Sequence, residues 1–115
     1  MEIGTDIESI SRIKTVLERT PRFKERCFTK NEIAYCESKG KNSAESYAAR
    51  FCAKEAFSKA IGHPLSWQDV EILNNNKGKP EVFIYNKAKE LLGNRTVKIS
   101  LSHASGMAIA FVIVY

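Results

Sequence analysis

The sequence lacks a long hydrophobic run and a leader-like start, and both absences limit what it can encode. It nowhere offers the roughly 18 consecutive apolar residues that a transmembrane helix needs. It does not begin with the charged and then hydrophobic segments of a secretory signal peptide. Repeats, linkers and low-complexity segments are also missing. We therefore expect a single cytoplasmic domain that spans residues 1–115.

Cysteine is scarce, and its spacing excludes two common uses. Cys27, Cys36 and Cys52 are odd in number and form neither a CxxC pair nor a zinc-finger pattern. This pattern predicts reduced thiols rather than a disulfide framework or a zinc site. With 43% hydrophobic and 27% charged residues, the composition is typical of a globular protein with an ordinary core.

Residues 12–30 form a basic segment in which acidic residues are few. This segment has seven basic and two acidic residues, so it accounts for the whole net charge of +5, and the rest of the chain is balanced. Such an asymmetry favours an anionic partner, whether nucleic acid, a membrane surface or an acidic protein. A solvated face without a partner is the simpler alternative. The basic residues are Arg12, Lys14, Arg19, Arg22, Lys24, Arg26 and Lys30.

Hydrophobic periodicity and turn residues predict an α+β fold. Ser9 and Thr29 are candidate helix N-caps, Pro21 should end the first helix, and Gly62 should end the longest one. The order of elements predicts one mostly antiparallel sheet packed against a long central helix. The expected elements are a strand over 2–9, helices over 9–20, 29–39 and 43–61, strands over 69–73 and 81–85, a helix over 86–93, and a hairpin of strands 96–103 and 107–115.

The segment RFCAKEAFSKAIG, residues 50–62, contains an unusual pair of charges. At about 100° per residue, Glu55 and Lys59 share a helical face with Ala48, Phe51 and Cys52, which should face a core. An (i, i+4) Glu–Lys pair often stabilises a surface helix, and that is the simpler interpretation. Burying the pair against alanine and cysteine would cost desolvation energy, which a bound cation or phosphate would offset.

Three further residues are candidates for chemistry, each with a simpler alternative. Asp6 lies mid-strand beside Gly4, whose missing side chain leaves space above that face, or it is a solvent-facing aspartate. His103 continues an apolar strand face, where a hydrogen-bonded core histidine is equally expected. Lys79 lies beside a glycine in NKGKP, and the simpler interpretation of this segment is a charged turn without a ligand. Asp6 and Glu55 would suit Mg²⁺, which takes few protein ligands.

Together these motifs resemble a known family. GTDIESISRI at the start, RFCAKEAFSKAIG in the middle, and SWQDVEI, NKGKP and SLSHA further on are similar in order and spacing to the holo-acyl-carrier-protein synthases. These are the small, single-module class of 4′-phosphopantetheinyl transferases. The resemblance covers nearly the whole chain. Its most specific parts are the strand aspartate and the KEAxxKA helix, and Trp67 is a small departure.

The resemblance implies a reaction and a set of residues. Such enzymes transfer the phosphopantetheine arm of coenzyme A to a serine of an apo acyl carrier protein and release adenosine 3′,5′-bisphosphate. By resemblance, Asp6 and Glu55 hold the Mg²⁺ cofactor and Lys59 contacts a phosphate. Glu55 is the expected general base through a water, with Asp6 or activation by the metal alone as alternatives. The coenzyme A site is expected to include Arg50, His103, Lys59, Lys41 and Lys79.

The resemblance also implies partners. The family assembles as a ring of three with each active site between adjacent chains, so we expect a homotrimer acting in fatty-acid biosynthesis. Acyl carrier proteins are small and acidic, which makes the basic segment their expected docking surface. No nucleic-acid or membrane partner is expected. The expected docking residues are Arg12, Arg19, Arg22 and Arg26.

Two functions of other classes remain open on the residues alone. The first is a non-catalytic, basic nucleic-acid-binding module, although the basic segment interleaves only Phe23 and Phe28 and has no recognition motif. The second is a Mg²⁺-dependent nucleotide hydrolase, which the absence of a glycine-rich phosphate loop disfavours.

Overall fold

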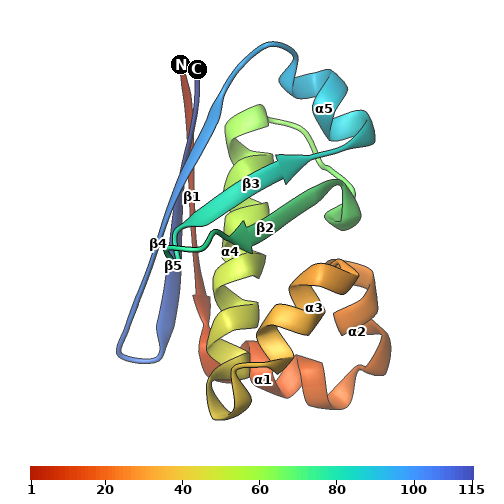
Figure 1. Cartoon of the computed structure of the whole chain (residues 1–115), viewed down its shortest axis with the longest axis vertical. Helices are drawn as coiled ribbons and strands as arrows, with labels where there is room; N and C mark the ends of the chain where they lie inside the picture. The colour runs from red at the N-terminus through yellow and green to blue at the C-terminus, as the bar shows by residue number, and fades with distance from the viewer.

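A long helix, α4 (Ser43–Ile61), forms the centre of the molecule and is covered on two opposite sides (Figure 1). The computed structural model describes residues 1–115. The three-stranded sheet covers one side, and the β2–β3 hairpin and helices α1 to α3 cover the other. The other elements are β1 (Glu2–Ser9), α1 (Ile10–Arg19), α2 (Pro21–Cys27), α3 (Lys30–Glu37), β2 (Val70–Asn74), β3 (Pro80–Ile84), α5 (Asn86–Leu92), β4 (Val97–Ala104), β5 (Met107–Val114), and the short 3₁₀ turns η1 (Gly40–Asn42) and η2 (Trp67–Asp69).

All strand pairs are antiparallel, and they form two sheets. In the larger sheet, β5 lies between β1 and β4, and β1 pairs with β5 from Glu2↔Val114 to Ser9↔Met107. The smaller sheet is the β2–β3 hairpin. The predicted α+β fold, with antiparallel strands against a long helix, is confirmed. The expectation of one sheet needs correction, because β3 approaches β4 without joining its hydrogen-bonded ladder.

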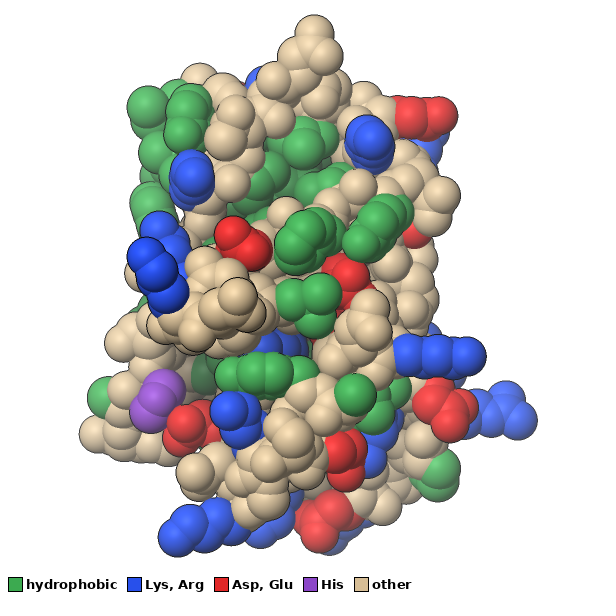
Figure 2. All heavy atoms as spheres, viewed as in Figure 1, with side chains coloured by type: hydrophobic (Ala, Val, Ile, Leu, Met, Phe, Trp, Pro, Cys, Tyr) green, Lys and Arg blue, Asp and Glu red, His purple; other side chains and the backbone are tan.

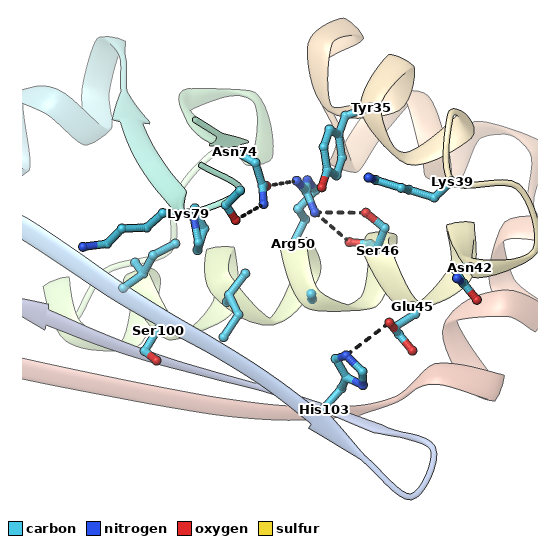
Figure 3. Close-up of a pocket in the computed structure, with 15 residues that line it drawn as sticks. Tyr35, Lys39, Asn42, Glu45, Ser46, Arg50, Asn74, Lys79, Ser100 and His103 are labelled. Atoms are coloured by element: carbon cyan, nitrogen blue, oxygen red, sulfur yellow. Dashed lines mark hydrogen bonds and ion pairs between the residues drawn. The ribbon is translucent and has the colours of Figure 1, made fainter. Parts of the chain in front are cut away.

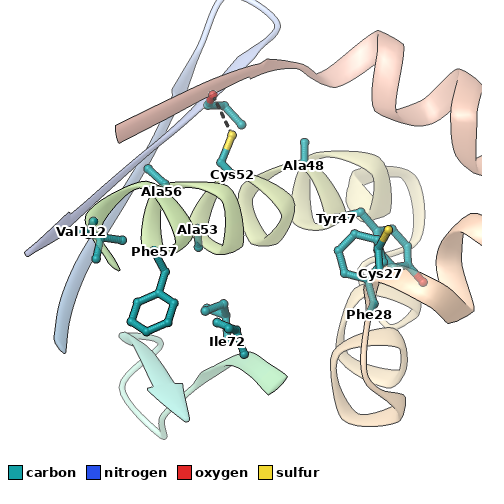
Figure 4. Close-up of a cluster of buried hydrophobic side chains, with 14 of the residues drawn as sticks. Cys27, Phe28, Tyr47, Ala48, Cys52, Ala53, Ala56, Phe57, Ile72 and Val112 are labelled. Atoms are coloured by element: carbon teal, nitrogen blue, oxygen red, sulfur yellow. Dashed lines mark hydrogen bonds between the residues drawn. The ribbon is translucent and has the colours of Figure 1, made fainter. Parts of the chain in front are cut away.

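Helix α4 is apolar on both of its covered sides, as expected for a helix in the interior. Figure 4 shows Cys52 and Ala56 directed toward the larger sheet, and Ala53 and Phe57 directed toward Ile72 of β2. All five side chains are fully buried. The Cys52 thiol donates a hydrogen bond to the Ala108 carbonyl of β5 at 3.3 Å, so the helix lies close against the sheet.

Gly4 allows the backbone of β1 to touch the backbone of α4. A Cβ atom at this position would lie 1.9 Å from the Ala56 carbonyl oxygen and 2.9 Å from the Ala60 nitrogen. Alternation along β1 then turns Asp6 toward the helix as well, while Ile3 is 61% exposed on the outer face. The alternative of a solvent-facing aspartate is therefore wrong, because the Asp6 side chain is only 11% exposed.

Most predicted helix ends are confirmed by their caps. Ser9 caps α1, Thr29 and Glu32 form the capping box of α3, and α4 ends at Gly62 in the left-handed conformation. Pro21 follows the end of α1 but also begins α2, which was not predicted, since proline fits the first turn of a helix. None of the helices combines the length and the hydrophobicity that a transmembrane span requires.

A buried ion pair connects α4 to the elements opposite the larger sheet. The Lys54 ammonium donates to Glu32 Oε1 at 2.6 Å, to the Cys27 carbonyl at 2.7 Å and to the Trp67 carbonyl at 2.9 Å. The second oxygen of Glu32 accepts the Ile72 amide at 2.8 Å. Burial lowers the pKa of Lys54, and the charge of Glu32 opposes this shift. The Lys54 ammonium thus connects α4 to the end of α2, to α3 and to η2. Glu32 extends this connection to β2.

The contact at Gly4 leads to a stability prediction. Gly4→Ala should lower the free energy of unfolding by about 3 kcal/mol or more, because its methyl group would collide with the backbone of α4. Gly62→Ala is the matched control: it meets open space at φ +77° and should cost only about 1–2 kcal/mol of left-handed strain. Urea unfolding measures both values, and equal losses would contradict the proposed close approach.

Candidate functional site

Asp6 and Lys59 meet where β1 contacts α4. The Lys59 ammonium donates to Asp6 Oδ1 at 3.1 Å and to the Thr5 carbonyl at 3.0 Å. Lys59 therefore pairs with the strand carboxylate, and Glu55, one turn earlier on α4, has no ion-pair partner. The other oxygen of Asp6, Oδ2, is buried and has no hydrogen-bond partner. This unpartnered oxygen leaves a free acceptor beside Glu55.

Negative charge accumulates around Asp6. Burial raises the pKa of Glu55, the charge of Asp6 raises it further, and Lys59 opposes the shift. Burial also raises the pKa of Glu8 to about 7, and the nearby carboxyl groups of Asp6 and Glu55 raise it further. Glu8 was not among the predicted site residues, although the alternation of β1 places it on the face of Gly4 and Asp6. Of these three carboxyl groups only Asp6 forms an ion pair, with Lys59, and the charge of Arg12 opposes the raised pKa of Glu8.

Cys52 lies beneath these carboxyl groups and remains a thiol. Burial raises its pKa to about 12, and the charges of Asp6 and Glu8 contribute to the shift. Since a nucleophilic cysteine needs a lowered pKa, Cys52 is a core residue that packs α4 against the sheet.

A second group of predicted residues lines a cavity of about 570 Å³ on another part of α4 (Figure 3). Arg50, Lys79 and His103 all contribute to its wall. His103 Nε2 lies 3.2 Å from Glu45 Oε1, and its side chain is 56% exposed. The alternative of a core histidine at this position is therefore wrong.

Arg50 is the buried cation of this cavity. Its guanidinium donates to Asn74 Oδ1 at 2.6 Å and to Ser46 Oγ at 3.0 Å, and its Nε has no partner. The residue is only 3% exposed and is not paired with a carboxylate. A buried guanidinium with a free donor and no counterion favours binding of an anion.

Within one chain, the predicted site residues form two separate groups. Asp6, Glu55 and Lys59 do not line the Arg50 cavity. Glu55 instead lines a different hollow of about 410 Å³, together with Trp67. Lys41 belongs to neither group, because it lines neighbouring hollows beside η1.

The basic segment forms the exposed faces of α1 and α2. Its four predicted docking residues are exposed, and none of them forms an ion pair. Figure 2 shows basic side chains projecting from the lower part of the molecule, where α1 to α3 lie. These uncompensated charges are available to an acidic partner. They are Arg12, Arg19, Arg22 and Arg26.

The pKa of Glu8 predicts how metal-free stability depends on pH. Because folding raises this pKa from 4.5 to about 7, the folded state favours the protonated form. Its contribution to stability is complete below about pH 4.5 and is lost as the pH rises to about 7. Glu8→Gln should therefore be more stable than wild type at about pH 8 and less pH-dependent. Urea unfolding measures this, with Glu2→Gln on the same strand as the control. A Glu8 carboxyl that titrates near 4.5 by NMR would contradict the assignment.

Known proteins are similar to this chain in sequence and in fold. The model of the 4′-phosphopantetheinyl transferase superfamily matches residues 2–112. The holo-[acyl-carrier-protein] synthase of Ruminiclostridium cellulolyticum is 45% identical, over 99% of this chain and 91% of that protein. The crystal structure of the Bacillus anthracis holo-(acyl-carrier-protein) synthase in complex with CoA (3′,5′-ADP) has a TM-score of 0.83 at 35% identity, covering 98% of this chain and 94% of that one. The Helicobacter pylori holo-[acyl-carrier-protein] synthase in complex with coenzyme A also has a TM-score of 0.83, at 34% identity, covering 98% and 99%.

The motifs noted in the sequence, from the strand aspartate to the KEAxxKA helix, thus belong to a family match that extends over nearly the whole chain. The chain is a member of the 4′-phosphopantetheinyl transferase superfamily, and within it of the holo-[acyl-carrier-protein] synthases.

Proposed function

We propose that this chain transfers the 4′-phosphopantetheine arm of coenzyme A to a serine hydroxyl of an apo acyl carrier protein, with adenosine 3′,5′-bisphosphate as the leaving group and Mg²⁺ as the cofactor. The observation that carries the proposal is the buried, unpartnered Oδ2 of Asp6, a residue that pairs with Lys59 through Oδ1 and whose charge raises the pKa of both Glu8 and Glu55. Relatives with the same fold are named for this activity, and two of them were solved with coenzyme A or its nucleotide.

The residues around Asp6 fit a divalent cation. Mg²⁺ is commonly held by one or two carboxylates and completes its shell with water and substrate phosphates. Asp6 offers a free buried oxygen, and Glu55 has no competing ion pair. No three His, Cys, Asp or Glu side chains converge as a ready-made metal site. Asp6 and Glu55 are therefore the proposed ligands, and a bound Mg²⁺ would neutralise charge that develops on the pyrophosphate.

The chain's own residues would orient the substrate and move the proton. Lys59 is 55% exposed, so its ammonium can turn from Asp6 toward a phosphate oxygen as that charge arrives. The raised pKa of Glu55 suits a group that accepts the serine proton through a water. Arg50, Lys79 and His103 would hold the nucleotide end of coenzyme A. Lys41 is the less supported member of that proposed set, because it lies outside the cavity.

We propose that two chains complete one active site, in a homotrimer. The two groups of site residues do not meet within one chain, so a neighbouring chain would supply one of them. The outer face of the larger sheet is apolar, with Ile3 61%, Ile7 54%, Ile109 41% and Phe111 43% exposed. An exposed patch of this kind is typical of an interface. Figure 2 shows hydrophobic side chains at the upper left edge, over this sheet.

The basic faces of α1 and α2 would dock the acidic carrier protein, through Arg12, Arg19, Arg22 and Arg26. Opposite charges on the two proteins would speed their association and set their relative orientation. Docking would thus depend on α1 and α2, whereas the chemistry would take place at Asp6. We also propose the cytoplasm as the place of action. The three cysteines are free and buried, which is compatible with a reducing compartment.

The metal assignment is tested by neutralising its ligands. Asp6→Asn and Glu55→Gln keep the shape of each side chain, and each should reduce turnover by about a hundredfold or more, as is typical for losing a charge-stabilising group. Intact-mass analysis of an apo carrier with coenzyme A, at limiting and saturating Mg²⁺, follows the transfer. Glu90→Gln on α5 is the matched control and should behave as wild type. Near-normal turnover of either ligand variant at limiting Mg²⁺ would show that the assignment is wrong.

A shared active site is tested by mixing two inactive variants. Glu55→Gln and His103→Ala change different groups, so a mixed trimer contains one site with both residues intact. Random mixing of equal amounts should restore about a quarter of wild-type activity, given cyclic symmetry. Glu55→Gln mixed with Asp6→Asn changes the same group twice and should restore nothing. An active monomer by light scattering, or equal restoration in both mixtures, would contradict the shared site.

A further inference from the structure

The last turn of α2 presents carbonyls that no backbone amide binds. Every helix leaves its final carbonyls without an intrahelical partner. In α2 the Lys24 carbonyl accepts the Phe28 amide at 3.1 Å, and the three carbonyls that follow accept no backbone amide. The helix has seven residues and no side-chain cap at its start, so it is too short to keep its place by itself. Side chains from other elements therefore have to hold it.

Two side chains from outside α2 bind these carbonyls. The Lys54 ammonium of α4 donates to the Cys27 carbonyl at 2.7 Å. The side-chain amide nitrogen of Gln68, in η2, donates to three carbonyls around the end of the helix, those of Glu25 at 2.9 Å, Arg26 at 3.3 Å and Phe28 at 2.8 Å. Gln68 thus connects the end of α2 directly to η2.

Gln68 and Lys54 differ in how much else depends on them. Lys54 is buried and neutralises Glu32, so its loss would disturb the core. Gln68 is exposed, and the bonds to the end of α2 are the only hydrogen bonds of its side chain. Replacing Gln68 should therefore spare the fold and loosen one helix, which otherwise packs against α1 and η2.

The helix that Gln68 holds carries half of the proposed docking residues. Arg22 and Arg26 of α2 are exposed and form no ion pair. A binding surface that is already ordered loses less conformational entropy when its partner arrives, so it binds more tightly than a loose one. The order of α2 before docking therefore affects how well its arginines bind an acidic carrier.

We propose that Gln68 is a positioning residue that pre-organises α2 for docking of the acidic carrier protein. The inference rests on the proposed function and names a role for a residue outside the predicted site. Gln68 acts through the end of the helix, because its amide holds α2 in the orientation that presents Arg22 and Arg26 to the carrier. The apparent affinity for the carrier falls when that orientation is only partly populated. Gln68 does not line the Arg50 cavity, so binding of coenzyme A does not depend on it.

Steady-state kinetics of the full-length protein, with an apo carrier and coenzyme A, test this role. Gln68→Met keeps the length of the side chain and removes its donor. It should raise the carrier KM about threefold to tenfold, as is typical for losing neutral hydrogen bonds, and leave kcat and the coenzyme A Kd unchanged. The kcat is retained because a saturating carrier selects the docked orientation. Asn94→Met, an exposed amide without a side-chain hydrogen bond, is the matched control and should keep the wild-type KM.

Hydrogen exchange of the free protein tests the same contact without the carrier. The amides in the last turn of α2 should exchange severalfold faster in Gln68→Met than in wild type, because that turn opens more often. The amides of α4 should exchange at the wild-type rate, since the core is unchanged. Equal protection of α2 in both proteins would show that Gln68 does not hold the helix.

A coupling measurement separates positioning from direct contact with the carrier. Arg22→Gln removes one proposed docking charge. If Gln68 acts through α2, Arg22→Gln should cost less in the Gln68→Met background than in wild type, because the loosened helix already presents that arginine poorly. Independent, additive losses would mean that Gln68 touches the carrier itself.

The outcomes distinguish this inference from the proposed function. An unchanged carrier KM in Gln68→Met, a loss of coenzyme A affinity that matches the change in KM, or additive losses with Arg22→Gln would overturn the inference. In each case a wild type that modifies the carrier leaves the proposed function standing. A wild type that modifies no carrier would overturn the proposed function, and this inference with it.

Discussion

The close approach of β1 to α4 at Gly4 is the constraint on which the rest of the structure depends. With the backbones in contact, only small residues such as Ala56 fit between the sheet and the helix. The same contact fixes the height of the next inward residue, Asp6, relative to the turns of α4 that carry Glu55 and Lys59. A packing requirement in the core therefore sets the geometry of the candidate metal site.

On its opposite side, α4 is held by the buried ion pair between Lys54 and Glu32. Lys54, the residue before Glu55, uses all three of its donors on Glu32 and two backbone carbonyls. All three donors of Lys54 and both oxygens of Glu32 have hydrogen-bond partners. The buried pair therefore fixes the positions of the surrounding segments without leaving an unpaired charge in the interior. The apolar contact at Gly4 and the ionic contact at Lys54 thus hold α4 from two sides, and the exposed basic helices are joined to the same framework.

Local signals in the sequence predicted most of the fold, and contacts between distant residues account for what they missed. The loop at Gly40–Asn42 and the glycine stop at Gly62 predicted the bounds of α4, and alternation predicted β1 with Asp6 on the face of Gly4 and Glu8, but not that this face lies against α4. No local signal separates the β2–β3 hairpin from the larger sheet, because that depends on which edges meet across α4. The pairing of Lys59 with Asp6, 53 residues apart in the chain, likewise depends on tertiary packing.

The crowding of Asp6, Glu8 and Glu55 makes this region a liability for the folded chain on its own, since part of the packing energy is used to hold repelling groups together. Selection for thermal stability alone would therefore favour neutral side chains at these three positions, and it would enrich variants that are more stable but have lost activity. The useful direction for engineering lies elsewhere, on exposed surfaces such as α5, where substitutions do not change the repulsion among the carboxyl groups of the proposed cation site.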